Sequence, residues 1–135
     1  MNLDTQTHSE VVGVLHALGA AIAGGDVDAV LANFSESDDL VMFGSERPET
    51  AYGRAELESL WARVLSRGQR YVWHWTEETV ATAGEVAWLS AQALVTIDDD
   101  AGHRELLYRA TLVLKRQSGR WLIEQYHGSE PAETW

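Results

Sequence analysis

The side chains best suited to bind or transform a ligand lie near the end of the last predicted strand. A tight turn at a Ser-Gly pair joins the last two strands and pairs Leu112 with Gln125. The same register pairs Ala110 with His127. Because both partners are apolar, His127 and Gln125 are predicted to face the interior. There a histidine can bind a ligand acid or act as a general acid or base, Gln125 can orient the ligand, and Tyr108 can add a hydroxyl.

Aromatic side chains form a second candidate group. Trp61 follows the apolar spacing of a predicted helix, and Tyr52 lies just before that helix. Trp73 and Trp75 alternate on one side of a strand-like run, 70–80. Aromatic walls with few polar groups suit a flat, partly apolar ligand, although aromatics at such spacings also form ordinary cores. Alternation alone leaves open which side of this run faces inward.

Acidic and histidine side chains give little support to a metal site. Asp38-Asp39 can divide acid and base roles between two carboxylates, or form a solvated turn. The run 98–100 is Asp-Asp-Asp, without the spaced ligands of an EF-hand. The five histidines show no zinc-binding spacing, and cysteine is absent. With no nucleotide-binding glycine motif either, we expect neither metal nor cofactor.

Composition narrows the class of protein. Its 135 residues suit one domain, 1–135, and the net charge of −11 disfavours binding to nucleic acid or anionic membranes. No apolar run approaches the ~20 residues of a membrane span, and the first ten residues do not resemble a signal peptide. We therefore expect a cytoplasmic protein.

Helical patterns fill the first half of the chain, and strand patterns fill the second. This order predicts an α+β fold, because strands joined by tight turns pair with each other in an antiparallel sheet. A capping box at Thr7 and Glu10 is expected to begin the first helix, and Asp26 to cap the second. The predicted helices run to 23, over 27–33 and over 54–67; the predicted strands cover 40–43, 70–80, 86–97, 106–117 and 120–129, and residues 45–53 are expected to form a loop.

One face of the last two strands mixes apolar and charged side chains. Thr111, Val113, Leu122 and Tyr126 share this face in the register above. Together they would expose an apolar patch if solvated. We therefore expect a homodimer that buries this sheet face.

Several motifs together resemble the SnoaL-like branch of the nuclear-transport-factor-2-like superfamily, over nearly the whole chain. The closing segment is also similar to the end of the association domain of calmodulin-dependent kinase II. The resemblance implies a curved antiparallel sheet wrapped around N-terminal helices, forming a cone with a central cavity, and commonly a dimer through the sheet. It further places Trp73 and Trp75 inward, with Tyr71 and Glu77. The motifs are Gly-Gly-Asp-Val-Asp-Ala-Val at 24–30, Tyr-Gly-Arg-Ala-Glu-Leu at 52–57, Gly-Glu-Val-Ala-Trp at 84–88 and the run 109–123.

One departure bears on chemistry. Ketosteroid isomerases resemble this chain at 31–34 and 44–46, and between them they carry an aspartate base on a short strand that here reads Leu-Val-Met-Phe. A proton-abstracting carboxylate cannot be replaced by these side chains. Asp39 or Glu46 would then have to enter the cavity from elsewhere.

Three functions are compatible with these residues. The first is a domain that binds a small, partly apolar molecule in its cavity. The second is a cofactor-free isomerase, cyclase or dehydratase that uses His127 as acid or base with Tyr108 or Asp39. The third is an association module whose sheet surface is the functional part.

Overall fold

The computed structural model describes residues 4–133 and has the predicted α+β architecture. Three helices occupy the first half, and four long strands follow. None of the helices in the described part of the chain is long and apolar enough to cross a membrane. The elements are α1 (Thr5–Ala23), α2 (Val27–Leu31), β1 (Val41–Phe43), β2 (Thr50–Tyr52), α3 (Arg54–Leu65), β3 (Arg70–Ala83), β4 (Val86–Asp99), β5 (Gly102–Gln117) and β6 (Arg120–Ser129).

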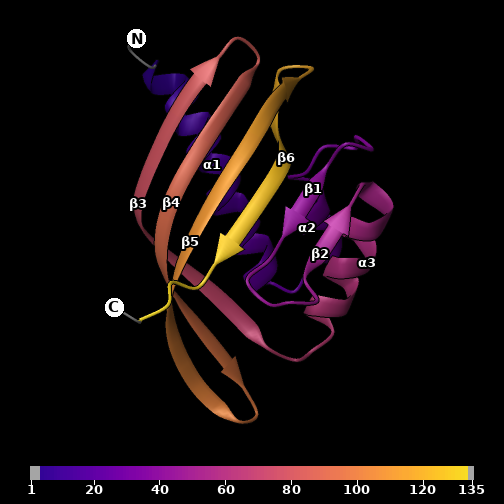
Figure 1. Cartoon of the computed structure of the whole chain (residues 1–135), viewed down its shortest axis with the longest axis vertical. Helices are drawn as coiled ribbons and strands as arrows, with labels where there is room; N and C mark the ends of the chain where they lie inside the picture. Colours follow the sequence, from indigo (N-terminus) through magenta and orange to yellow (C-terminus); the bar gives the residue numbers. More distant parts are fainter. Residues whose placement is uncertain (1–3, 134–135) are drawn as a thin grey trace.

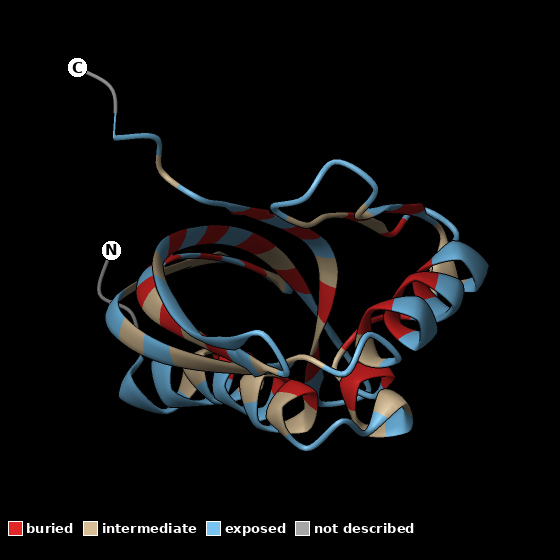
Figure 2. Cartoon of the chain, turned by 90° about the horizontal axis from the view of Figure 1, so that it is seen from below, coloured by how far each residue is buried: buried red, intermediate tan, exposed pale blue. Residues whose placement is uncertain are grey.

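The strands form one curved sheet in the order β2-β1-β6-β5-β4-β3 (Figure 1). Strands β3 to β6 are an antiparallel meander, as predicted, whereas β1 pairs parallel with β6. The sheet stays open and bends over the helices, so that its concave side faces α1 (Figure 2).

Helix α1 buries Val11, Leu15, Leu18 and Ile22 on one face and ends, as predicted, at residue 23, with Gly24 as its C-cap. Its start differs from the prediction: Asp4, not Thr7, is the N-cap, and its Oδ1 accepts a hydrogen bond from the Gln6 amide at 2.9 Å. The side chain of Asp26 caps α2 as expected, at 3.1 Å from the Ala29 amide. Residues 45–53 are not entirely a loop, because β2 forms within them and pairs with β1.

The core lies between the concave sheet face and the helices. In β4 the small and branched side chains alternate along the strand and face inward: Ala87, Leu89, Ala91, Ala93, Val95 and Ile97 are buried. The alanines leave room above the helices. Arg54 at the start of α3 ties the layers together, because its Nη1 donates to the carbonyls of Leu31, Phe34 and Ser35, each at 3.0 Å.

A bulge in β6 overturns part of the predicted register. Leu114 pairs with Ile123 as predicted, but Val113 then pairs with Gln125, so Glu124 has no partner of its own on β5. One extra residue reverses the alternation of every later side chain in the strand. Tyr126 therefore points inward and pairs with Leu112.

A second bulge lies in β3. Trp75 pairs with Ala93 and Glu77 with Gln92, which leaves Thr76 unpaired. Tyr71 and Trp73 face inward as the resemblance implied, but the inward placement of Glu77 is wrong: Glu77 is exposed, beside Gln92. Glu78 turns toward α1 instead and contacts the His16 ring at 2.7 Å.

Candidate functional site

A cavity of about 210 Å³ opens between the concave sheet face, α3 and the segment 44–49. Apolar side chains from the helices and the sheet form its floor, and polar groups gather at one wall and at the mouth. Its lining includes Ile22, Met42, Ser45, Glu46, Glu49, Trp61, Val64, Gln69, Tyr71, Trp73, Val95, Ile97, Arg104, Leu106, Tyr108, Tyr126 and Glu130. The lining is therefore apolar within and polar at the entrance, a pattern typical of small-molecule sites.

Two buried tyrosines form the polar wall. The hydroxyls of Tyr108 and Tyr126 are 2.7 Å apart and hydrogen-bonded, and both side chains are buried. Burial raises the pKa of both phenols, so both are neutral. One of the two hydroxyls donates its proton to the other, so the proton of the accepting hydroxyl remains available for a further hydrogen bond. Gly128 makes this pair possible, since a Cβ there would lie 1.8 Å from the Tyr108 oxygen.

Glu49 supplies a carboxylate to the same cavity. Its Oε1 accepts the Glu46 amide at 2.9 Å, and its Oε2 lies 3.2 Å from Arg67. The side chain is only 16% exposed. Burial raises the pKa of the Glu49 carboxyl, opposed by the hydrogen bond from Glu46. Gly44 admits the carboxylate, because a Cβ there would lie 2.5 Å from its Oε1.

A chain of hydrogen bonds surrounds the mouth. Arg67 contacts Glu46 at 2.8 Å and donates to the Tyr71 hydroxyl at 3.2 Å. Tyr71 in turn donates to Gln69, whose Nε2 donates to Asp99 at 3.1 Å. This chain joins the end of α3, the start of β3 and the tip of the β4–β5 hairpin. Burial raises the pKa of Tyr71, which keeps this hydroxyl protonated as a donor.

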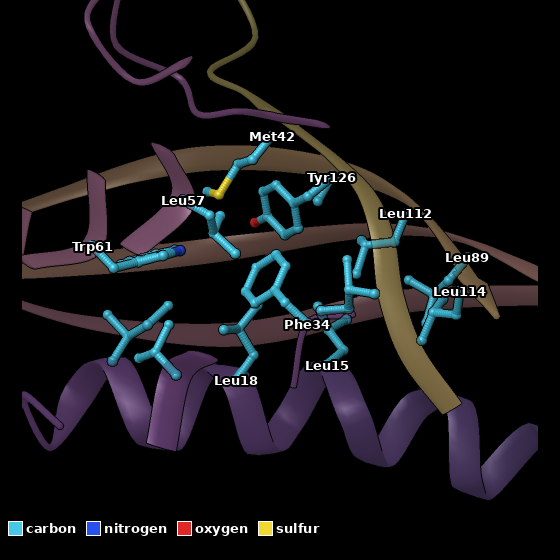
Figure 3. Packing of buried hydrophobic residues seen from close by; sticks show 14 of the residues in the cluster. Leu15, Leu18, Phe34, Met42, Leu57, Trp61, Leu89, Leu112, Leu114 and Tyr126 are labelled. Atoms are coloured by element: carbon cyan, nitrogen blue, oxygen red, sulfur yellow. The ribbon is translucent and has the colours of Figure 1, made fainter. Parts of the chain in front are cut away.

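Two indole groups in the cavity wall lack hydrogen-bond partners. The Nε1 atoms of Trp61 and Trp73 are buried, and neither donates to any atom of the described residues. The indole nitrogen of Trp61 and the hydroxyl of Tyr126 are directed toward the same space, beside Met42 and Leu57 (Figure 3). A buried N–H without an acceptor is uncommon in folded proteins.

Three of the predicted ligand-binding residues line the cavity: Trp61, Trp73 and Tyr108. Trp75 is near but not part of the lining. Its ring packs against Tyr108 with centroids 6.3 Å apart, and it borders a shallower groove beside α1. Trp61 and Trp73 therefore form an aromatic wall of the cavity, whereas Trp75 lies outside its lining.

The inward placement of His127 and Gln125 is wrong. Both side chains are exposed on the convex face, because the Glu124 bulge reverses the alternation. The His127 ring contacts Phe43 edge-on, with centroids 5.6 Å apart. Tyr52 is also outside the cavity, 60% exposed, and its ring packs against the same Phe43.

The acidic pair Asp38-Asp39 forms the solvated turn, which was one of its two predicted alternatives, and its position does not support the acid–base role. Asp39 is exposed in the turn before β1 and does not line the cavity. Glu46, the other carboxylate expected to enter from elsewhere, does reach the mouth. Among residues 4–133, no three histidine or acidic side chains gather closely enough to hold a metal ion.

Glu49 and Tyr126 are the site residues that sequence reasoning missed. An uninterrupted register places Tyr126 on the convex face. Glu49 lies in a segment predicted to be a loop, without periodicity to orient it. The signal available for Glu49 was Gly44, since a glycine beside a short strand often marks a close approach of another group.

Comparisons with known proteins agree with this architecture. The chain resembles a dehydratase candidate of the NTF2-like family from Streptomyces avermitilis, with a TM-score of 0.84, 17% identity, and coverage of 94% of this chain and 97% of that one. It resembles a ketosteroid isomerase-like protein from Erwinia carotovora atroseptica, with a TM-score of 0.77, 22% identity, and coverage of 96% and 99%. It also resembles a candidate calcium/calmodulin-dependent protein kinase II association domain from Xanthomonas campestris, with a TM-score of 0.77, 24% identity, and coverage of 93% and 88%. At these identities the likeness establishes the fold.

No curated protein sequence matches the chain at a significant level. The family model described as a SnoaL-like domain matches residues 11–133, which is most of the chain. Together with the curved α+β sheet and its cavity, this match shows that the chain belongs to the SnoaL-like domain family.

Proposed function

We propose that the protein binds a small, partly apolar molecule in the cavity, with an acceptor oxygen of the ligand against the Tyr108–Tyr126 pair. The observation that carries the proposal is this hydroxyl pair, buried at one wall of an otherwise apolar cavity. Its spare proton has no acceptor among the described residues. A ligand carbonyl placed there would complete the hydrogen bonding, and the aromatic walls would cover its apolar body.

The test uses tetralone, a bicyclic ketone, as the probe. We expect binding by calorimetry, and we expect the double variant Tyr108→Phe/Tyr126→Phe to lose about 1–3 kcal/mol of binding free energy, because the carbonyl then loses its donor. His127→Ala is the matched control, since this side chain lies on the opposite face of the same strand as Tyr126. Equal losses in the double variant and the control would contradict the proposal.

A second candidate function is proton transfer on the bound molecule, with Glu49 as the acid–base group. Glu49 favours it because its carboxyl is half-buried, lines the cavity and has a raised pKa, the properties of a general acid or base. Glu49, Tyr108 and Tyr126 line the same cavity, so a ligand bound there can contact all three groups. The carboxylate would remove a proton from the carbon beside the carbonyl, and a tyrosine hydroxyl would stabilise the enolate oxygen.

Exchange of the protons beside the tetralone carbonyl in deuterated water, followed by NMR, tests this second function. We expect Glu49→Gln to slow the protein-dependent exchange by about 100-fold or more, since general acid–base catalysis supplies about 10²–10⁴-fold. Glu46→Gln is the matched control, because Glu46 also pairs with Arg67 but is 50% exposed. Exchange that survives Glu49→Gln unchanged would exclude Glu49 as the base.

A further inference from the structure

The cavity offers more hydrogen-bond donors than the described residues can satisfy. Trp61 is only 5% exposed, and its indole N–H has no acceptor among the described residues. The tyrosine pair adds one spare hydroxyl proton, from a different element of the fold. These donors lie on α3 and on the sheet, so they approach the cavity from two sides. Leaving them unpaired is unfavourable, and an incoming acceptor removes that penalty.

The charges at the mouth oppose an anionic ligand. Glu46, Glu49 and Glu130 line the cavity, against Arg104 alone. Arg104 already lies 3.7 Å from Asp99, and Arg67 pairs with both Glu46 and Glu49. The three lining carboxylates and the two arginines therefore leave a net charge of −1, within a chain of net charge −11. Arg67 and Arg104 each have a carboxylate partner, so a ligand carboxylate would have to compete with those partners.

We infer that the ligand is an uncharged, flat molecule with two separated acceptor oxygens, one bound by the Tyr108–Tyr126 hydroxyls and the other by the indole N–H of Trp61. This inference rests on the proposed function, since it assumes that the cavity holds a ligand. It assigns Trp61 a binding role beyond that of an apolar wall. Quinones and diketones of bicyclic size belong to this class of molecule.

Trp121 provides an internal control for the role of the indole. It is as buried as Trp61, at 5% exposure, and its Nε1 also lacks a partner. It does not line the cavity, and instead packs under the Arg116 guanidinium at 5.4 Å. Trp61→Phe and Trp121→Phe therefore remove the same kind of orphaned donor, but only the first removes it from the cavity.

The experiment measures the affinity of three probes by calorimetry: naphthoquinone with two carbonyls, tetralone with one, and naphthoate with a charged carboxylate. Naphthoquinone cannot react with a cysteine thiol of the protein, because the chain has no cysteine. We expect naphthoquinone to bind about 2- to 10-fold more tightly than tetralone, which corresponds to one neutral hydrogen bond. We expect naphthoate to bind at least about 10-fold more weakly than naphthoquinone, because of the acidic mouth.

The variants assign the second acceptor. Trp61→Phe should abolish the advantage of naphthoquinone over tetralone, whereas Trp121→Phe, which lies outside the cavity lining, should preserve that advantage. Binding of naphthoate as tight as that of naphthoquinone, or an advantage that survives Trp61→Phe, would overturn this inference and leave the proposed function intact. Failure of all three probes to bind would overturn both.

Discussion

Gly128→Ala should strain the fold by displacing Tyr108. The backbone of Gly128 is not in the left-handed region, so alanine suits its conformation, but the new Cβ would lie 1.8 Å from the Tyr108 oxygen and 2.5 Å from its Cζ. Real Cβ atoms keep about 3.0 Å or more from such neighbours, so the phenol must retreat by more than 1 Å. The 2.7 Å bond to Tyr126 would not survive that shift.

The size of the effect follows from two contributions. Breaking a hydrogen bond between two buried hydroxyls costs about 1–3 kcal/mol. Forcing an extra methyl group into a packed region costs about 1–3 kcal/mol more. We therefore expect Gly128→Ala to lower the free energy of unfolding by about 2–6 kcal/mol. The affinity for tetralone should fall as well, because the same shift disturbs the polar wall of the cavity.

Urea unfolding followed by circular dichroism measures this change. Gly13→Ala is the matched control, because a Cβ at this position in α1 meets nothing within 4 Å, and alanine should stabilise the helix by about 0.5–1 kcal/mol. In a Tyr108→Leu background, Gly128→Ala should lower the free energy of unfolding far less, so the coupling energy between the two substitutions should exceed about 1 kcal/mol. An equal cost in both backgrounds would refute the assigned contact.

Three further predictions concern other parts of the chain. Burial holds the pKa of Glu49 above its ordinary 4.5, so the folded chain binds this proton at a higher pH than the unfolded chain does. The free energy of unfolding should therefore rise as the pH falls from above the folded pKa of Glu49 to below 4.5. Glu49→Gln should remove that rise from a series of urea unfolding curves measured at different pH values. We propose a dimer through the convex sheet face, where Trp88 is 47% exposed and pairs with Val113. Val113→Lys should lower the molecular mass measured by sedimentation without changing the circular dichroism spectrum. A parent protein that sediments as a monomer would contradict the dimer. Asp26→Ala should cost about 1 kcal/mol of unfolding free energy by removing the α2 cap, and an unchanged urea midpoint would show that the cap contributes nothing.

The sequence by itself determined the three helices, the four long strands and most of the core, but not the short strand β2. The helical spacing of Leu15 and Leu18 and the alternation of Ala91 and Val95 can be read from the sequence, and all four side chains are buried in the structure. These assignments needed only local periodicity and burial, which are properties of each segment alone. The same signals placed Trp61 on the buried face of α3.

The tertiary structure decided which polar groups meet in the cavity. Alternation has a period of two, so a single unpaired residue at Glu124 exchanged His127 for Tyr126 at the inner face. That bulge lies where β6, still paired with β5, begins to pair with β1 on its other side, and nothing in the local sequence marks it. Glu49 likewise reaches the site because the segment 44–49 folds back over the mouth and Gly44 leaves room for its carboxylate. Contacts between segments distant in sequence fixed both side chains, which is why local patterns predicted the aromatic walls and Tyr108 but neither Tyr126 nor Glu49.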